Sequence, residues 1–238
     1  MAANGGELRD KDSPEPLLVA RGLRLSYGQT TALERADVEV WPGRIIAVTG
    51  RSGSGKSSLL YCLAGVLRPD SGSVTYRGEE MTLLDDDGLT ELRRSEFGFV
   101  FQFGELVPEL TIAENVALPL RLNGDRGKPV RRRVDELLEE LGVAALAGKR
   151  PAEVSGGEAQ RAAVARALVH RPRVVFADEP TGSLDSDNSQ IVLAQFVALA
   201  KTHTAAVVLV THEARVAAVA DSWVEVVDGS TRVKPTAP

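Results

Sequence analysis

A glycine-rich segment, residues 50–57, limits the possible folds of this chain more than any other feature. Its sequence, GRSGSGKS, fits the pattern G-x-x-x-x-G-K-[ST]. The apolar run 45–48 before it is typical of a buried strand, and the run 58–64 after it is typical of an apolar helix. A strand, a tight loop and a helix in this order predict an α/β fold whose loop surrounds a phosphate group.

The residue types of this loop suit phosphate chemistry. Glycines allow backbone N–H groups to close on phosphate oxygens, and the helix N-terminus adds a partial positive charge. We expect Lys56 to reach the β- and γ-phosphates of a nucleotide and Ser57 to bind Mg²⁺. A serine- and glycine-rich turn could match the pattern by chance, but the flanking strand and helix argue against that reading.

The composition is that of an ordinary globular protein. Of the 238 residues, 43% are hydrophobic and 26% charged, and no apolar run approaches the ~20 residues that span a bilayer. The formal net charge of -5 argues against a general nucleic-acid binder. Cys62 is the only cysteine, which excludes an intrachain disulfide. These features favour a cytoplasmic protein that reaches a membrane only through a partner.

The apolar pattern predicts one domain with an insertion. Residues 1–16 are polar and lack the apolar core of a signal peptide, so we expect a disordered tail. Alternating apolar residues predict strands within 17–41, and the last third of the chain alternates strands with helices, a parallel α/β pattern. The middle, about 88–170, is mainly helical. The domain is therefore expected over 17–233, with a frayed end over 234–238.

Two further segments place polar residues where such a fold binds ligands. Asp178 and Glu179 follow an apolar strand, and the carboxyl ends of parallel strands face the ligand crevice. Asp178 can hold Mg²⁺, directly or through water, and Glu179 can take a proton from an attacking water. The Ser-Gly-Gly sequence 155–157 begins a predicted helix and is a second candidate anion-binding surface.

Each of these motifs is a weak signal by itself, because an Asp-Glu pair or a Ser-Gly-Gly sequence is often only a helix cap. This chain carries the whole set in one order. The members are Tyr27, the phosphate loop, Gln102 after a strand, Ser155-Gly156-Gly157 at a helix start, Asp178-Glu179, Ser183-Leu184-Asp185, and His212 after a last apolar strand.

This ordered set resembles the nucleotide-binding subunit of an ABC transporter, over nearly all of the chain from Leu17 to Gly229. Residues 101–102, 111–116 and 177–185 resemble more particularly the branch of macrolide exporters, lipoprotein-release systems and cell-division complexes. The resemblance implies a P-loop NTPase core with a mostly parallel sheet, an N-terminal antiparallel β subdomain and an inserted α-helical subdomain. It also implies a Mg²⁺-dependent ATPase.

The resemblance assigns a role to each matching residue. Tyr27 would stack on adenine, and the phosphates would be bound by Gly50, Arg51, Ser52, Gly53, Ser54, Gly55, Lys56, Ser57 and Ser58. Mg²⁺ would be held by Ser57, Gln102 and Asp178. The catalytic set would be Glu179 as general base, His212 at the γ-phosphate, Lys56, and Gln102, which would also touch the attacking water and sense the permease.

The resemblance further implies a homodimer around two ATP molecules that powers a separate integral membrane permease of the macrolide-exporter or cell-division kind. The nucleotide of the opposite subunit would be contacted by Ser155, Gly156, Gly157 and Glu158, and Asp185 would lie at the dimer interface. The chain would then lie in the cytoplasm, held at the inner face of the cell membrane by the permease.

Three other readings concern the partner. The same ATPase could drive a mechanotransmitting complex that moves no solute, and nothing in the chain separates this from an exporter. A soluble ABC protein of translation or DNA repair ranks lower, because the chain has one cassette, one cysteine and no heptad array. Arg131-Arg132-Arg133 could suggest nucleic acid, but nearby acidic residues favour a solvated helix face, so no nucleic-acid partner is expected.

Overall fold

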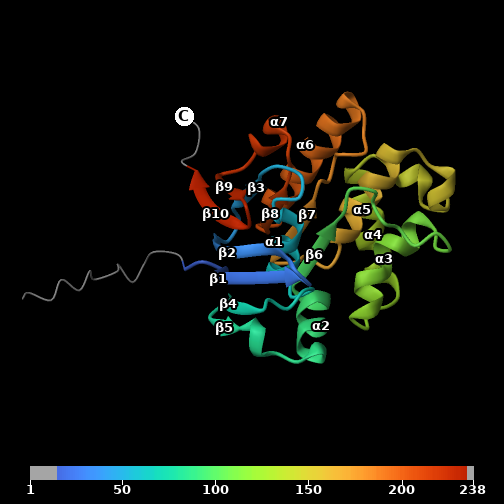
Figure 1. Cartoon of the computed structure of the whole chain (residues 1–238). Helices are drawn as coiled ribbons and strands as arrows, with labels where there is room; N and C mark the ends of the chain where they lie inside the picture. Colours follow the sequence, from blue (N-terminus) through green and yellow to red (C-terminus); the bar gives the residue numbers. More distant parts are fainter. Residues whose placement is uncertain (1–14, 235–238) are drawn as a thin grey trace, which may run out of the picture.

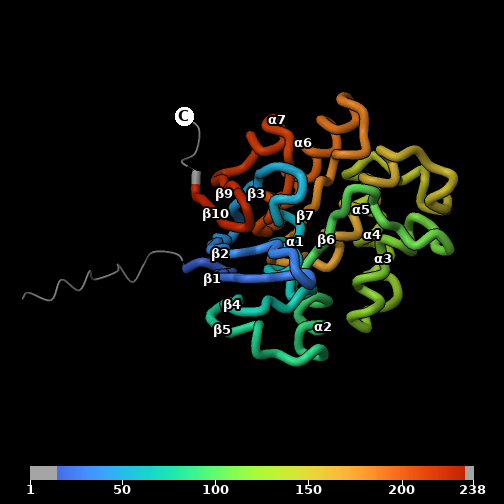
Figure 2. Tube along the Cα trace, viewed as in Figure 1, coloured from blue at the N-terminus to red at the C-terminus, as the bar shows by residue number. Residues whose placement is uncertain are grey.

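A ten-stranded sheet organises residues 15–234, the part of the chain that the computed structural model describes (Figure 1). The strand order is β5-β4-β1-β2-β10-β9-β3-β8-β7-β6. The tail expected over 1–16 and the fraying expected over 234–238 fall almost wholly outside the described residues. The trace enters β1 and leaves β10 on the same side of the molecule (Figure 2).

One part of the sheet is parallel and the other antiparallel, as predicted. Parallel pairs join β3 (Ile45–Thr49), β6 (Phe97–Val100), β7 (Val174–Asp178), β8 (Ala206–Val210) and β9 (Ser222–Val227). Antiparallel pairs join β1 (Leu18–Tyr27), β2 (Thr30–Val40), β4 (Ser71–Tyr76) and β5 (Glu79–Glu80). The strand β10 (Ser230–Lys234), which the sequence pattern did not predict, lies between β9 and β2.

Helices cover both faces of the parallel strands. One apolar core packs α1 (Lys56–Leu63), α2 (Asp86–Ser95) and the antiparallel strands on one face. The other core packs α3 (Ile112–Leu122), α4 (Lys128–Glu140), α5 (Gly156–Leu168), α6 (Ser186–Thr202) and α7 (Ala214–Ala217). Short 3-10 turns cover Met81–Leu83, Ala144–Leu146 and Pro151–Glu153. No helix within residues 15–234 is long and apolar enough to cross a membrane.

The helices α3, α4 and α5 gather beyond the β6 edge of the sheet (Figure 1). The range expected for the helical insert, 88–170, also contains β6, which pairs with β7 in the central sheet. The run of helices without strands therefore begins only after Val100. The helix α3 begins with a capping box, in which Thr111 Oγ1 accepts from the Glu114 N–H and the Glu114 carboxylate accepts from the Thr111 N–H.

His170, just beyond α5, makes the stability of the fold depend on pH. Its Nε2–H donates to the Phe97 carbonyl (2.9 Å), and its Nδ1 is buried without a hydrogen-bond partner among the described residues. Burial lowers the pKa of His170, and the Phe97 bond and the Glu96 charge oppose this only in part. His170 therefore has a lower pKa in the folded state than in the unfolded chain, where the pKa is about 6.5. As pH falls below about 6.5, the unfolded chain binds the proton before the folded state does, so the folded state loses stability.

We expect His170→Gln, which keeps a donor but has no titrating ring, to lose less stability on acidification than the wild type. Urea unfolding midpoints of both proteins, measured on either side of about pH 6.5, test this. Equal losses in the two proteins would contradict the role given to His170.

Candidate functional site

Four predicted site segments follow the carboxyl ends of neighbouring parallel strands. The phosphate loop follows β3, Gln102 follows β6, Glu179 follows β7, and His212 follows β8. Because parallel strands end at the same edge of the sheet, these side chains meet there. They border a pocket of about 630 Å³, here named the strand-end pocket, lined by Tyr27, Thr30, Thr31, Ala32, Ser52, Gly53, Gly55, Lys56, Ser57, Ser58, Gln102, Glu179 and His212.

Two glycines of the phosphate loop occupy positions that a side chain could not fill. At Gly55, where φ is 104°, a Cβ would lie 2.2 Å from the Ala32 carbonyl oxygen of β2. At Gly50, where φ is 148°, it would lie 2.4 Å from the Val226 carbonyl oxygen of β9. The helix α1 begins directly at Lys56, and no side chain caps it. Its first N–H groups therefore remain for a ligand.

The loop holds two polar groups that lack adequate partners. The Lys56 ammonium is buried and donates to the Arg51 carbonyl oxygen at 2.9 Å. The Ser54 hydroxyl is buried and has no hydrogen-bond partner within the described part of the chain. A buried polar group without adequate partners is costly, and a phosphate group in the strand-end pocket would relieve this cost for Lys56, which lines the pocket.

Asp178, at the end of β7, is bound by two hydroxyl groups of α1. Ser57 Oγ donates to Asp178 Oδ1 at 3.2 Å, and the Tyr61 hydroxyl donates to Asp178 Oδ2 at 3.3 Å. Burial raises the pKa of Asp178, while these hydrogen bonds lower it in part. Burial and the Asp178 charge raise the pKa of Tyr61 to about 12. Tyr61 was not among the predicted site residues, because in the sequence it is only one more position of an apolar helix.

Glu179 and His212 form a pair at the edge of the pocket. His212 Nδ1 lies 2.7 Å from Glu179 Oε1, and the histidine is exposed whereas the glutamate is mostly buried. Glu179 has a φ of 47°, in the left-handed region that residues other than glycine rarely adopt. Such strained positions are concentrated at functional sites. The Glu179 N–H donates to the Val210 carbonyl of β8 at 3.0 Å, which holds the two strand ends together.

The loop that carries Gln102 is held by residues from distant segments. Ser183 Oγ donates to the Gln102 carbonyl oxygen at 2.6 Å. Gln160 of α5, which is 1% exposed, donates to the carbonyls of Phe101 (2.8 Å) and Pro180 (2.6 Å). Gln160 thus links α5 to both the Gln102 loop and the segment after Glu179. This role of Gln160 was not predicted from the sequence, in which the residue is only an amide among the apolar residues of the helix.

Tyr27 lines the mouth of the pocket with an exposed ring, and its hydroxyl lies 3.5 Å from Ser58 Oγ. The predicted loop residues Gly50, Arg51 and Ser54 do not line the pocket, although they shape the loop. An exposed aromatic face beside a phosphate loop is able to stack on a flat ring.

The residues expected to act on the opposite subunit lie outside the strand-end pocket. Ser155 caps α5 in a capping box with Glu158, whose carboxylate accepts from the Ser155 N–H at 2.8 Å. Hydrogen bonds from Ser155 lower the pKa of Glu158. Asp185 caps α6 by accepting from the N–H groups of residues 187 and 188. Ser155, Gly156 and Asp185 are all exposed.

The starts of α5 and α6 pack against each other. A Cβ on Gly156 would lie 3.8 Å from Leu184 Cδ2, and one on Gly157 would lie 3.1 Å from Asn188 Oδ1. Asn188 in turn donates to Asp185 at 2.7 Å. Gly157 is therefore buried against α6, and the exposed surface of this helix start belongs to Ser155 and Gly156.

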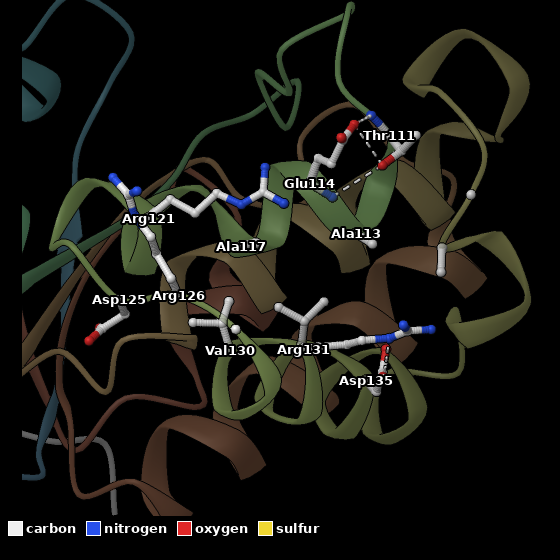
Figure 3. Close-up of a pocket in the computed structure, with 14 residues that line it drawn as sticks. Thr111, Ala113, Glu114, Ala117, Arg121, Asp125, Arg126, Val130, Arg131 and Asp135 are labelled. Carbon is white, nitrogen blue, oxygen red and sulfur yellow. Dashed lines mark hydrogen bonds and ion pairs between the residues drawn. The ribbon is translucent and has the colours of Figure 1, made fainter.

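A larger pocket, of about 680 Å³, lies between α3 and α4 (Figure 3). It shares no residue with the strand-end pocket. Its Glu114 is bonded to Thr111 in the capping box, and its Arg131 lies 3.9 Å from Asp135 (Figure 3). It contains neither a glycine-rich loop nor the end of a parallel strand, so the chemistry predicted from the motifs lies elsewhere.

Known proteins of one family resemble this chain along most of its length. A family model described as ABC transporter matches residues 33–182. The lipoprotein-releasing system ATP-binding protein LolD 2 of Caulobacter vibrioides is 40% identical over 219 residues, or 90% of this chain and 96% of that protein. The macrolide export ATP-binding/permease protein MacB of Marinobacter nauticus is 39% identical over 222 residues, or 91% of this chain and 34% of that longer protein.

A solved structure shares the fold. The ATP-binding cassette MJ0796, in a dimeric post-hydrolysis state bound to ADP and Pi, superposes with a TM-score of 0.84 at 33% identity, covering 93% of this chain and 99% of that one. The family match runs from β2 to just beyond β7, so it contains the phosphate loop, Gln102, α5 and Glu179. As its motifs indicated, the chain belongs to the ABC transporter family, as an ATP-binding cassette that hydrolyses ATP.

Proposed function

We propose that two copies of this chain close around two ATP molecules and power a separate membrane permease of the lipoprotein-releasing type. The observation that carries this proposal is the division of the site. The strand-end pocket holds the phosphate loop, Glu179 and His212, whereas Ser155 and Asp185 are exposed elsewhere on the same chain. In a dimer with two-fold symmetry, the exposed residues of each copy would complete the pocket of the other copy.

Within one strand-end pocket, each residue has a separate role in binding or hydrolysing ATP. Tyr27 stacks on adenine, while the loop N–H groups and the Lys56 ammonium hold the phosphates. Glu179 accepts a proton from the attacking water, and His212 keeps that carboxylate in place and reaches the γ-phosphate. The Glu179 backbone, linked to β8, holds the base in one position without movement at the moment of reaction.

The pocket fits Mg²⁺. This ion takes oxygen ligands and is usually held by one or two carboxylates together with substrate phosphates. Ser57 and Gln102 line the pocket with a hydroxyl and an amide oxygen, and Asp178, which does not line it, holds a carboxylate 3.2 Å from the Ser57 hydroxyl. Within residues 15–234, no group of three or more His, Cys, Asp or Glu side chains could hold a metal ion by itself. When bound with ATP, Mg²⁺ neutralises charge on the phosphates.

An apolar groove suits the permease. It has a volume of about 530 Å³ and is lined from α2, β6, α3 and α5, and its lining includes the exposed side chains of Val66 and Leu122. Phe101 and Glu105, on either side of Gln102, also line it. A membrane protein seated in this groove would press on the loop that carries Gln102, so binding of the permease would reach the ATP site. The chain would then lie on the inner face of the membrane.

We expect Leu122→Asp to prevent association with the permease, because a carboxylate would lose solvation in an apolar groove. The tagged chain is co-expressed with the lipoprotein-release permease of the same genome, and co-elution in detergent is measured. Leu83→Asp is the matched control, since Leu83 is also exposed but does not line the groove. Binding of a fluorescent ATP analogue shows that each variant is folded. Co-elution of Leu122→Asp at the wild-type level would place the permease elsewhere.

A further inference from the structure

The Tyr61 hydroxyl contacts the candidate metal ligand Asp178 from a rigid position. The tyrosine lies on α1, five residues after Lys56, and its ring packs against the core formed by α1 and the antiparallel strands. Its own carbonyl accepts from the N–H groups of Val66 (2.9 Å) and Leu67 (3.1 Å), which ends the helix there. Backbone hydrogen bonds and ring packing therefore fix the position of the tyrosine, and its hydroxyl contacts Asp178 from this fixed position.

The two oxygens of Asp178 have separate donors. Ser57 binds Oδ1 and Tyr61 binds Oδ2, so rotation of the carboxylate about its bond to Cβ would break both hydrogen bonds. Ser57 has a second proposed task, because it is also expected to hold Mg²⁺. Tyr61 has no other partner among the side-chain hydrogen bonds of the described residues. It is thus the donor whose only evident effect is on the direction of the Asp178 carboxylate.

We propose that Tyr61 is a positioning residue, which orients Asp178 for the divalent cation that enters with ATP. This inference rests on the proposed function of the strand-end pocket. Partners that orient a metal ligand typically change metal affinity or activity by 10–100-fold when they are removed. The hydrogen bond of Tyr61 is single and 3.3 Å long, so we place its effect at the lower end, about tenfold.

The test is a Mg²⁺ titration of Tyr61→Phe, which removes the hydroxyl and keeps the ring. Affinity for a fluorescent ATP analogue is measured in EDTA and at increasing Mg²⁺, and ATP hydrolysis is followed over the same series. We expect nearly wild-type affinity in EDTA and a Mg²⁺ midpoint raised about tenfold, both for binding and for hydrolysis. A tyrosine that served only the core would change the affinity in EDTA or the thermal stability but not the Mg²⁺ midpoint.

The chain offers a matched control in Tyr76, whose hydroxyl donates to the Glu96 carboxylate at 2.7 Å, away from the strand-end pocket. Tyr76→Phe loses the same kind of bond and should leave the Mg²⁺ midpoint unchanged. Asp178→Asn should remove most of the Mg²⁺ dependence, and Tyr61→Phe in that background should add nothing.

An unchanged Mg²⁺ midpoint in Tyr61→Phe would overturn the inference and leave the proposed function intact. A wild-type protein that binds and hydrolyses ATP without Mg²⁺ would instead overturn the proposed function. An additional loss from Tyr61→Phe in the Asp178→Asn background would show that Tyr61 acts by another route than Asp178, which also contradicts the inference.

Discussion

Glu179→Gln should abolish steady-state ATP hydrolysis while ATP remains bound. Loss of a general base typically costs ~10²–10⁴-fold in rate. Glutamine keeps the shape of the side chain, and the phosphate loop is not altered, so binding should survive. With ATP bound but not consumed, the closed dimer should accumulate. Turnover by the purified variant, measured as phosphate release, tests the role of the base directly.

Lys56→Ala is the control that separates binding from chemistry. Lys56 supplies the mobile cation of the loop, so its loss should weaken binding of labelled ATP itself. Hydrolysis by Glu179→Gln at nearly the wild-type rate would remove this glutamate from the mechanism. Wild-type affinity and turnover in Lys56→Ala would show that the phosphate loop is not the site.

Ser155→Trp should block ATP-driven dimerisation without affecting the ATP affinity of the monomer. Ser155 is exposed at the start of α5 and outside the strand-end pocket, so an indole there would enlarge this exposed helix start without filling the chain's own pocket. It would hold the helix N-terminus away from the partner's nucleotide, and turnover should fall with the dimer. Light scattering of Glu179→Gln with ATP, with and without Ser155→Trp, measures this effect.

Asp85→Trp serves as the matched control for this experiment. Asp85 is also exposed, and it caps α2 by accepting from the Gly88 N–H. Asp85→Trp therefore adds the same bulky side chain and removes a helix N-cap, as Ser155→Trp does, but at another helix. It should dimerise normally. If the Ser155→Trp double variant dimerised as readily as Glu179→Gln alone, this helix start would not face the partner. Gly157 is unsuitable for the test, because a side chain there would first meet Asn188 of its own chain.

The sequence by itself determined the class of fold and predicted most of the residues that line the strand-end pocket. Glycines at 50 and 55, a lysine and a serine between a buried strand and a helix permit few other structures. Glu179 was predicted because it follows an apolar strand, and parallel strands end at a common edge. His212 also follows an apolar strand, but its role was predicted from the resemblance to ABC ATPases and not from the local pattern. The strand β10 was missed, since residues 230–234 lack a clear apolar alternation.

Only the tertiary structure decided how these residues are held. The path of the phosphate loop depends on carbonyls of β2 and β9, which meet Gly55 and Gly50 from segments far apart in the sequence. Tyr61 reaches Asp178 across 117 residues of sequence, and Gln160 reaches Phe101 across 59. Periodicity reports which face of an element is buried but not which neighbour it meets. For the same reason, the sequence named Ser155, Gly156 and Gly157 alike as trans contacts, and only the packing of α5 on α6 decided that Gly157 is buried whereas Ser155 and Gly156 are exposed.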